Sequence, residues 1–126
     1  MSQGDAVLIT SGPGMHIFVV INTPAPIPNY GIANQCVLVS FSTIHEEVPH
    51  DEACIVHPGV HPFITSPSYA VYRDTRIYRE DALCRGVDNG TFVRRPPPFE
   101  AQVVDELRAG LRTSRKVKRE FKNLEI

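Results

Sequence analysis

The side chains best suited to acid–base chemistry in this sequence are its five histidines, which all lie within the first 61 residues. An imidazole exchanges a proton near neutral pH, so it can serve as a general acid or base. Cleavage of RNA by its own 2′-hydroxyl needs a base at that hydroxyl, a cation or donor at the phosphate, and an acid at the leaving oxygen. Here His16 or His61 could be the base, and Arg73 or Arg76 could hold the phosphate.

Hydroxyl donors for the same phosphate are available at the end of the apolar segment 36–44, where Ser42 and Thr43 follow Phe41. The polar end of such a segment lies where a strand leaves its sheet, which places these hydroxyls at an edge. The assigned catalytic residues are His16 and His61 for acid–base chemistry, Thr43 as phosphate donor, Tyr72 for positioning, and Arg73 as phosphate clamp. The assigned substrate-binding residues are Ser42, Ser68, Tyr69, Arg76, Lys116 and Arg119.

Residues 55–72 (IVHPGVHPFITSPSYAVY) are the strongest candidate for a shaped site. Three prolines and one glycine stiffen this stretch, and proline lacks the amide hydrogen that a central strand needs. An apolar, proline-rich loop that presents His61, Ser68, Tyr69 and Tyr72 is typical of a binding or catalytic loop. The alternative is that residues 57–59 form a simple turn and that the tyrosines belong to the core.

Positive charge is confined to the second half of the chain. Residues 1–72 contain no Lys or Arg, and all 13 basic residues lie from Arg73 onward. Residues 108–122 carry seven basic side chains and one acidic one, Glu120. Such a segment can bind a polyanion such as RNA or an acidic protein partner, although a solvated helix face is the alternative. If the first half takes part in catalysis, it must do so without permanent cations.

Other common types of catalytic site lack their sequence signatures. His57 and His61 are four residues apart, but the prolines and glycine around them exclude the helix that makes this spacing a metal site. The sequence contains no Gly-x-Ser-x-Gly motif and no phosphate-binding loop ending in Gly-Lys-Ser/Thr. Cys54 lies in an apolar segment and is expected in the core rather than as a nucleophile. We therefore expect no metal site and no cofactor.

Length and cysteine content set the broad class of protein. A chain of 126 residues fits one domain with one core. Its three cysteines are an odd number without Cys-x-x-Cys spacing, which argues against a disulfide framework and a zinc ribbon. The apolar runs are far shorter than a membrane span, and the N-terminus does not resemble a signal peptide. These features predict a cytoplasmic protein that does not enter the membrane.

The hydrophobic pattern predicts a mainly β fold with a C-terminal helix. Phe99, Val103, Leu107 and Leu111 recur every four residues, which predicts a helix over 99–111. Several short strands closed by a helix indicate a small, strongly bent β-barrel, with residues 1–95 as the barrel and 96–126 as a helical segment with a basic tail on the same domain. Strands are predicted at 6–10, 16–22, 36–44, 53–57, 69–78 and 91–94, a long loop at 23–35, a helical turn at 79–85, and a second helix at 113–124.

The order of these segments resembles the PemK/MazF-like toxins of bacterial toxin–antitoxin pairs. The segments that carry the resemblance are Gly4–Leu8, the Gly/Pro turn, His16–Ile21 and Val37–Thr43, followed by Ser68–Val71 and Thr75–Ile77. The resemblance covers about residues 4–83 and implies an SH3-like barrel and a homodimer. It also implies metal-independent endoribonuclease activity on RNA, blocked by a cognate antitoxin protein.

Two departures make this chain a divergent relative of that family. Members of the family usually carry a catalytic arginine just before the second strand, where this chain has His16. The stretch 61–69 is also outside the usual pattern. The active site is then rebuilt around histidine, tyrosine and Arg73, or activity has been lost. Two alternatives are a non-catalytic SH3-like module that binds a protein through its Pro/Tyr loop and basic tail, and an accessory protein that blocks a host factor by mimicry.

Overall fold

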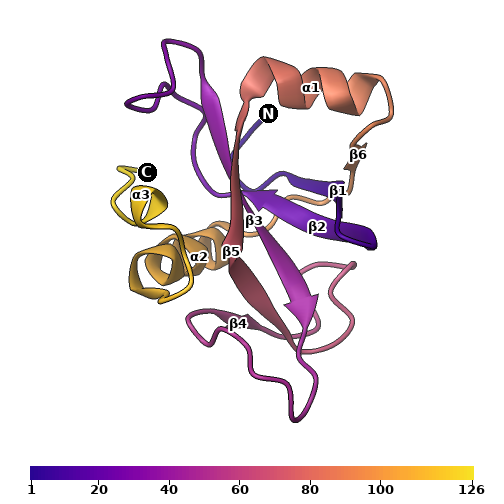
Figure 1. Ribbon diagram of the computed structural model, residues 1–126. Helices are drawn as coiled ribbons and strands as arrows, with labels where there is room; N and C mark the ends of the chain where they lie inside the picture. Colours follow the sequence, from indigo (N-terminus) through magenta and orange to yellow (C-terminus); the bar gives the residue numbers. More distant parts are fainter.

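The alternating apolar segments of the sequence form one antiparallel sheet in a computed structural model of residues 1–126 (Figure 1). Its strands are β1 (Ala6–Ser11), β2 (Gly14–Val20), β3 (Gln35–Thr43), β4 (Ile55–Val56), β5 (Ser68–Arg79) and β6 (Val93–Arg94). Their order in the sheet is β4-β5-β3-β2-β1-β6, and every pair of neighbours is antiparallel. The predicted mainly β fold is confirmed, but the sheet is open, with β4 and β6 at its edges.

Three helices accompany the sheet: α1 (Glu80–Asp88), α2 (Ala101–Thr113) and α3 (Arg119–Lys122). The predicted helix 99–111 is confirmed as α2, two residues further along. The turn predicted at 79–85 is the start of the full helix α1, whereas the helix predicted at 113–124 is reduced to the short α3. None of the three helices has the length and apolar character needed to cross a membrane.

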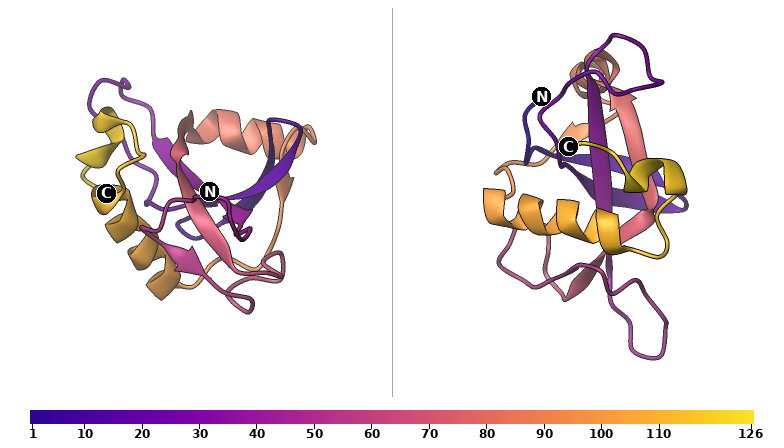
Figure 2. Two further views of the ribbon diagram at one scale, coloured as in Figure 1. Left: turned by 60° about the horizontal axis from the view of Figure 1, so that its bottom comes forward. Right: turned by 90° about the vertical axis from the view of Figure 1, so that its left-hand side faces the viewer.

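The two faces of the sheet are covered from opposite sides, as Figure 2 shows. On the first face, Val37 and Val39 of β3 pack with Val104 and Leu107 of α2 in a core cluster of 21 buried residues. On the second face, a smaller cluster includes residues of β1, β2 and β3 with Leu83 of α1. Successive side chains of a strand point to opposite faces, so β3 contributes to both clusters.

A bulge interrupts β5 opposite the middle of β3. Leu38 pairs with Arg76 and Ser40 pairs with Val71, so only Val39 lies opposite residues 72–75. The extra residues form a tight bend in which the Thr75 hydroxyl donates to the Tyr72 carbonyl over 2.7 Å. A bulge of this kind redirects the side chains of its strand, so the predicted strand 69–78 does not keep a regular alternation through residues 72–75.

Tyr72 lies in the core and connects the bulge to α2. It is 1% exposed, and its hydroxyl donates to the Leu107 carbonyl over 2.9 Å. Its ring fills the space over Gly110, where an added Cβ would lie 2.1 Å from the Tyr72 hydroxyl oxygen. Burial raises the pKa of Tyr72, so the phenol stays protonated. This placement corrects the prediction that Tyr72 positions a substrate, because its hydroxyl is used by the fold.

His61 is also part of the fold rather than of an open site. It is 3% exposed and stacks on Phe99 with 4.7 Å between the ring centroids. Its Nδ1 accepts a hydrogen bond from the Phe63 amide (3.0 Å), so Nε2 carries the hydrogen and donates to the Arg95 carbonyl (2.9 Å). Both ring nitrogens of a neutral imidazole are therefore engaged. The prediction of His61 as acid or base is corrected: it fastens the proline-rich loop to the segment before α2.

We predict that Gly110→Ala destabilises the protein by about 1–3 kcal/mol, because the new methyl group overpacks the Tyr72 ring. This loss exceeds the gain of about 1 kcal/mol that alanine brings to a helix interior. Urea denaturation of the variant and of Gly110→Ala in a Tyr72→Phe background measures the coupling. Removal of the phenol oxygen relieves part of the clash, so an equal loss in both backgrounds would contradict this account.

We predict that His61→Ala lowers the free energy of unfolding by about 3 kcal/mol, since it removes a buried, stacked ring and leaves two partly buried backbone groups without their partner. Thermal unfolding measures the effect. His57→Ala is the matched control, because His57 is exposed on the same loop. A loss no larger than that of His57→Ala would show that the loop is not held by His61.

Candidate functional site

The second face of the sheet changes from apolar to polar halfway along its central strands. On β3, Leu38 is buried in the cluster that includes α1, while Ser40 and Ser42 follow on the same face. On β2, Phe18 belongs to that cluster, and His16 lies two residues earlier on the same face. The polar half of this face therefore has no helix over it, and a hollow remains there.

This hollow is the first cavity, with a volume of about 370 Å³. His16, Ser40 and Ser42 line it from the central strands. Tyr69, Arg73 and Asp74 line it from β5. Four of the side chains assigned to the site from the sequence, namely His16, Ser42, Tyr69 and Arg73, thus meet around one space.

A second cavity of about 340 Å³ lies beside the first. The two share Tyr69, Val71 and Arg73, so one stretch of β5 forms their common wall. The other wall of the second cavity includes His50 and Lys116, which come from the loop 44–54 and from the segment after α2. The predicted binding residue Lys116 thereby lines the same cavity as Arg73.

His16 is half-buried and oriented by the neighbouring strand. Its Nδ1 lies 3.4 Å from the Phe41 carbonyl oxygen, and a carbonyl can only accept a hydrogen bond. Nδ1 therefore carries the hydrogen, which leaves Nε2 with a free lone pair. Nε2 makes no hydrogen bond within the protein, so it is available to accept a proton from a bound molecule.

Arg73 is the free cation of the first cavity. Its side chain is exposed and makes no hydrogen bond or ion pair with the rest of the chain. Arg76 differs, because it pairs with Asp74 over 3.3 Å and lies over the Phe18 ring at 4.7 Å. Burial opposes the charge of Arg76, but its bonds to Tyr78 and Asp74 raise its pKa. The predicted binding role of Arg76 is therefore replaced by a structural one.

The carboxylate in the wall of the first cavity is already occupied. Asp74 accepts a hydrogen bond from the Ser11 hydroxyl over 2.9 Å and pairs with Arg76. Ser40 is 2% exposed, and its hydroxyl has no hydrogen-bond partner in the protein. Every side-chain oxygen or nitrogen that is closed to solvent does have a partner, so the Ser40 oxygen keeps some contact with solvent. The Ser40 hydroxyl thus faces the cavity. The charge left for a ligand is the positive charge of Arg73, with hydroxyl groups beside it.

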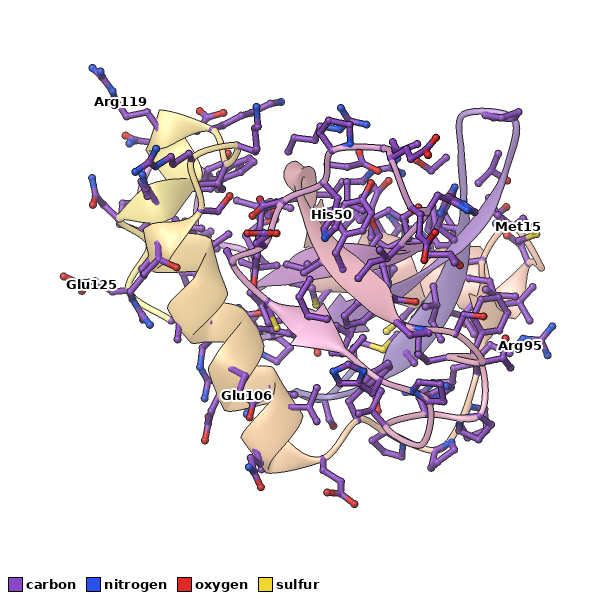
Figure 3. All side chains as sticks on the ribbon, turned by 90° about the horizontal axis from the view of Figure 1, so that it is seen from below. Met15, His50, Arg95, Glu106, Arg119 and Glu125 are labelled. Atoms are coloured by element: carbon purple, nitrogen blue, oxygen red, sulfur yellow. The ribbon has the colours of Figure 1, made fainter.

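His50 is the site residue that was not assigned from the sequence. It lies in a polar, turn-like segment, and its ring packs on Tyr69 with 5.2 Å between the centroids. The neighbouring Asp51 accepts hydrogen bonds from the Ala53 amide (2.9 Å) and the Ser114 hydroxyl (2.5 Å), which hold this segment in place. Figure 3 shows His50 near β5, and Arg119 projecting away from the body of the protein. Only its membership of the five histidines could have pointed to His50.

The remaining assigned residues lie outside the two cavities. Thr43 is exposed and points to the opposite face of β3 from Ser42. Ser68 is 4% exposed, and its hydroxyl donates to the Ser66 carbonyl in a turn. Arg119 is exposed on α3 and lines neither cavity. The Ser68 hydroxyl is therefore used by the fold, whereas Thr43 and Arg119 lie apart from the two cavities.

Two of the three free cysteines are buried and unreactive. Burial raises the pKa of Cys36 to about 12 and also raises the pKa of Cys54, so both thiols stay protonated at neutral pH. No group of three or more His, Cys, Asp or Glu side chains has an arrangement that would hold a metal ion. The groups with reactive character are thus the imidazoles and Arg73 at the cavities.

The chemistry available at the cavities is proton transfer by an imidazole beside a free guanidinium, with hydroxyl donors and an aromatic ring nearby. Such a set suits a phosphate ester whose reaction needs a base, an acid and a cation. Comparison of the chain with models of protein families, with curated proteins and with solved structures found no match. Function is therefore argued from the geometry of the cavities.

We predict that iodoacetamide at pH 8 labels Cys84, which is only half-buried, before Cys36 and Cys54. The buried thiols carry little thiolate, and the thiolate is the form that reacts. Peptide mass spectrometry over time gives the three rates, and labelling in denaturant gives the control in which all three react. Equal native rates would show that the core opens readily.

Proposed function

We propose that this protein is a toxin of a toxin–antitoxin pair, a metal-independent endoribonuclease that a cognate antitoxin inhibits. The observation that carries this proposal is the meeting of His16 and Arg73 in one cavity, with Tyr69 on the wall shared with the second cavity and another imidazole, His50, on the far wall of that second cavity. RNA contains its own nucleophile, so a protein that supplies a base, an acid and a cation can cleave it. The resemblance of residues 4–83 to PemK/MazF-like toxins adds the toxin class.

In the proposed reaction, Arg73 binds the scissile phosphate and stabilises the charge that grows on its oxygens. One imidazole takes the proton of the 2′-hydroxyl while O2′ forms a bond to phosphorus. The bond from phosphorus to O5′ breaks, and the other imidazole gives a proton to O5′. The products are a 2′,3′-cyclic phosphate and a free 5′-hydroxyl. We assign the two proton transfers to His16 and His50, which replaces the earlier pair of His16 and His61.

The proposed class also accounts for the shape of the sheet. We treat the curved, open sheet as a divergent SH3-like barrel to which α2 and α3 are added at the C-terminus. The strands β1, β2, β3 and β5 are neighbours in that order, which is compatible with such a barrel. The helices on the first face leave the first cavity accessible on the second face.

A second candidate function is a non-catalytic module that binds a protein partner. It is favoured by a different loop, residues 23–34, where Ile32 is 97% exposed and Tyr30 is 38% exposed. An isolated apolar side chain is common on protein surfaces, so this observation carries less weight than the cavities. Overexpression that leaves growth unchanged, together with stable binding of a partner, would favour the module.

We predict that the unaltered protein cleaves RNA in the presence of a chelator and that His16→Ala or His50→Ala slows cleavage by about 10²–10⁴-fold. Arg73→Ala is expected to cost about 10²–10³-fold, because it removes the cation at the phosphate. Single-turnover assays on a fluorescent RNA measure these rates, and mass spectrometry identifies the cyclic phosphate ends.

His57→Ala and Arg95→Ala are the matched controls for these variants. Both side chains are exposed, lie outside the two cavities, and have no ion pair. Arg95→Ala keeps the backbone carbonyl that His61 needs. No cleavage by the unaltered protein, or full activity of the folded His16→Ala variant, would refute the enzymatic proposal.

A further inference from the structure

We propose that the second cavity binds a second phosphodiester of the RNA strand, adjacent to the one that Arg73 holds, with Lys116 as its cation. This proposal rests on the ribonuclease function proposed above and specifies the substrate further. It predicts that the enzyme acts on a strand with at least two phosphodiesters rather than on a dinucleotide. It also gives one residue of the basic C-terminal segment a defined place at the site.

The first argument is the continuity of the cavities. The first and second share Tyr69, Val71 and Arg73. The second and a third, of about 340 Å³, share His50, Asp51 and Lys116. The hollows therefore follow one another from the central strands, across β5, to the segment after α2. A flexible polymer can occupy such a row with consecutive residues.

The second argument is the charge of the second cavity. Its charged lining residues are Arg73, Lys116 and Asp51. Asp51 is engaged by the Ala53 amide and the Ser114 hydroxyl, whereas Arg73 and Lys116 make no ion pair or hydrogen bond through their side chains. The unpaired carboxylates of the same loop, Glu46, Glu47 and Glu52, line neighbouring cavities and not the second. The second cavity thus favours an anion.

The third argument is that Lys116 is held in place by a buried contact. Ser114 is 1% exposed, and its oxygen both donates to Asp51 over 2.5 Å and accepts from the Lys116 amide over 3.0 Å. The same side chain therefore ties the segment of His50 to the backbone of Lys116. The adjacent Val117 is buried in the main core cluster. The backbone that carries this cation is thus already ordered, so binding costs less entropy than it would on a free tail.

The aromatic pair between the two cation positions suits a nucleotide base. Tyr69 lines both cavities, and His50 packs against it. Exposed aromatic faces bind bases of single strands by stacking, without strong sequence preference. One nucleotide at this pair would place its two phosphates toward Arg73 and Lys116. A dinucleotide has a single phosphodiester and cannot fill both positions.

The test uses short DNA strands with one ribonucleotide, so that only one phosphodiester can be cleaved. A neutral methylphosphonate then replaces the phosphodiester on the 5′ or the 3′ side of it. We expect one of these replacements to lower kcat/KM of the unaltered protein by about 10-fold, the effect of one charge-assisted contact. In Lys116→Ala the same replacement is expected to have no further effect, since the contact is already lost.

Arg119→Ala is the control, because it removes one exposed basic side chain of the same segment outside the cavities. We expect it to keep the full response to methylphosphonate. Ser114→Ala is a second variant in which Lys116 is present but no longer held. It is expected to lose most of the response, and circular dichroism checks that it is folded.

A binding assay separates this inference from the proposed activity. Fluorescence anisotropy with a non-cleavable 2′-methoxy strand measures affinity over a range of salt concentrations, whether or not the protein cleaves RNA. Lys116→Ala is expected to reduce the slope of log affinity against log salt by about 0.7, the value for one phosphate contact on a single strand. An unchanged slope, or an equal change in Arg119→Ala, would overturn the second subsite even if cleavage is observed.

Discussion

The molecule depends on one constraint: a single sheet has two faces to bury. The helices cover the first face, but they cover only the apolar half of the second. The first face packs under α2 and α3, with Leu107 and Phe121 fully in the core. The second face has only α1, whose Leu83 reaches the apolar half. An apolar surface left open would cost free energy, so the remaining half is polar. The cavities lie where apolar burial ends.

The bulge in β5 turns that open half-face into a site with a positive charge. It places Tyr72 in the core and the next residue, Arg73, in the cavities. The bond of Tyr72 to Leu107 and its close fit over Gly110 hold the bulge against α2. The orientation of Arg73 therefore depends on packing on the far side of the sheet. A substitution that changes the packing of Tyr72 on α2 therefore also changes the position of Arg73.

The sequence predicted what depends on local periodicity, including the strands at 6–10 and 36–44 and the helix after Phe99. It could not predict the bulge, because a bulge is defined by the pairing of β5 with a distant strand. From the sequence, acid–base chemistry was assigned to His61, which is buried in the fold, and not to His50, which lines the second cavity. Each of the two follows or precedes a proline, and what buries His61 is contact with residues more than 30 positions away, Arg95 and Phe99, which local sequence does not reveal.

The charge asymmetry of the chain acquires a physical meaning in this arrangement. The first 72 residues hold no Lys or Arg, yet they supply both imidazoles of the cavities. The two free cations of the second cavity, Arg73 and Lys116, come from later segments, and each is adjacent in sequence to a buried residue, Tyr72 and Val117. Folding of the second half onto the first is thus what brings positive charge to the imidazoles. The groups proposed to transfer protons and to bind phosphate meet only in the folded chain, so the proposed chemistry would begin only once the core is formed.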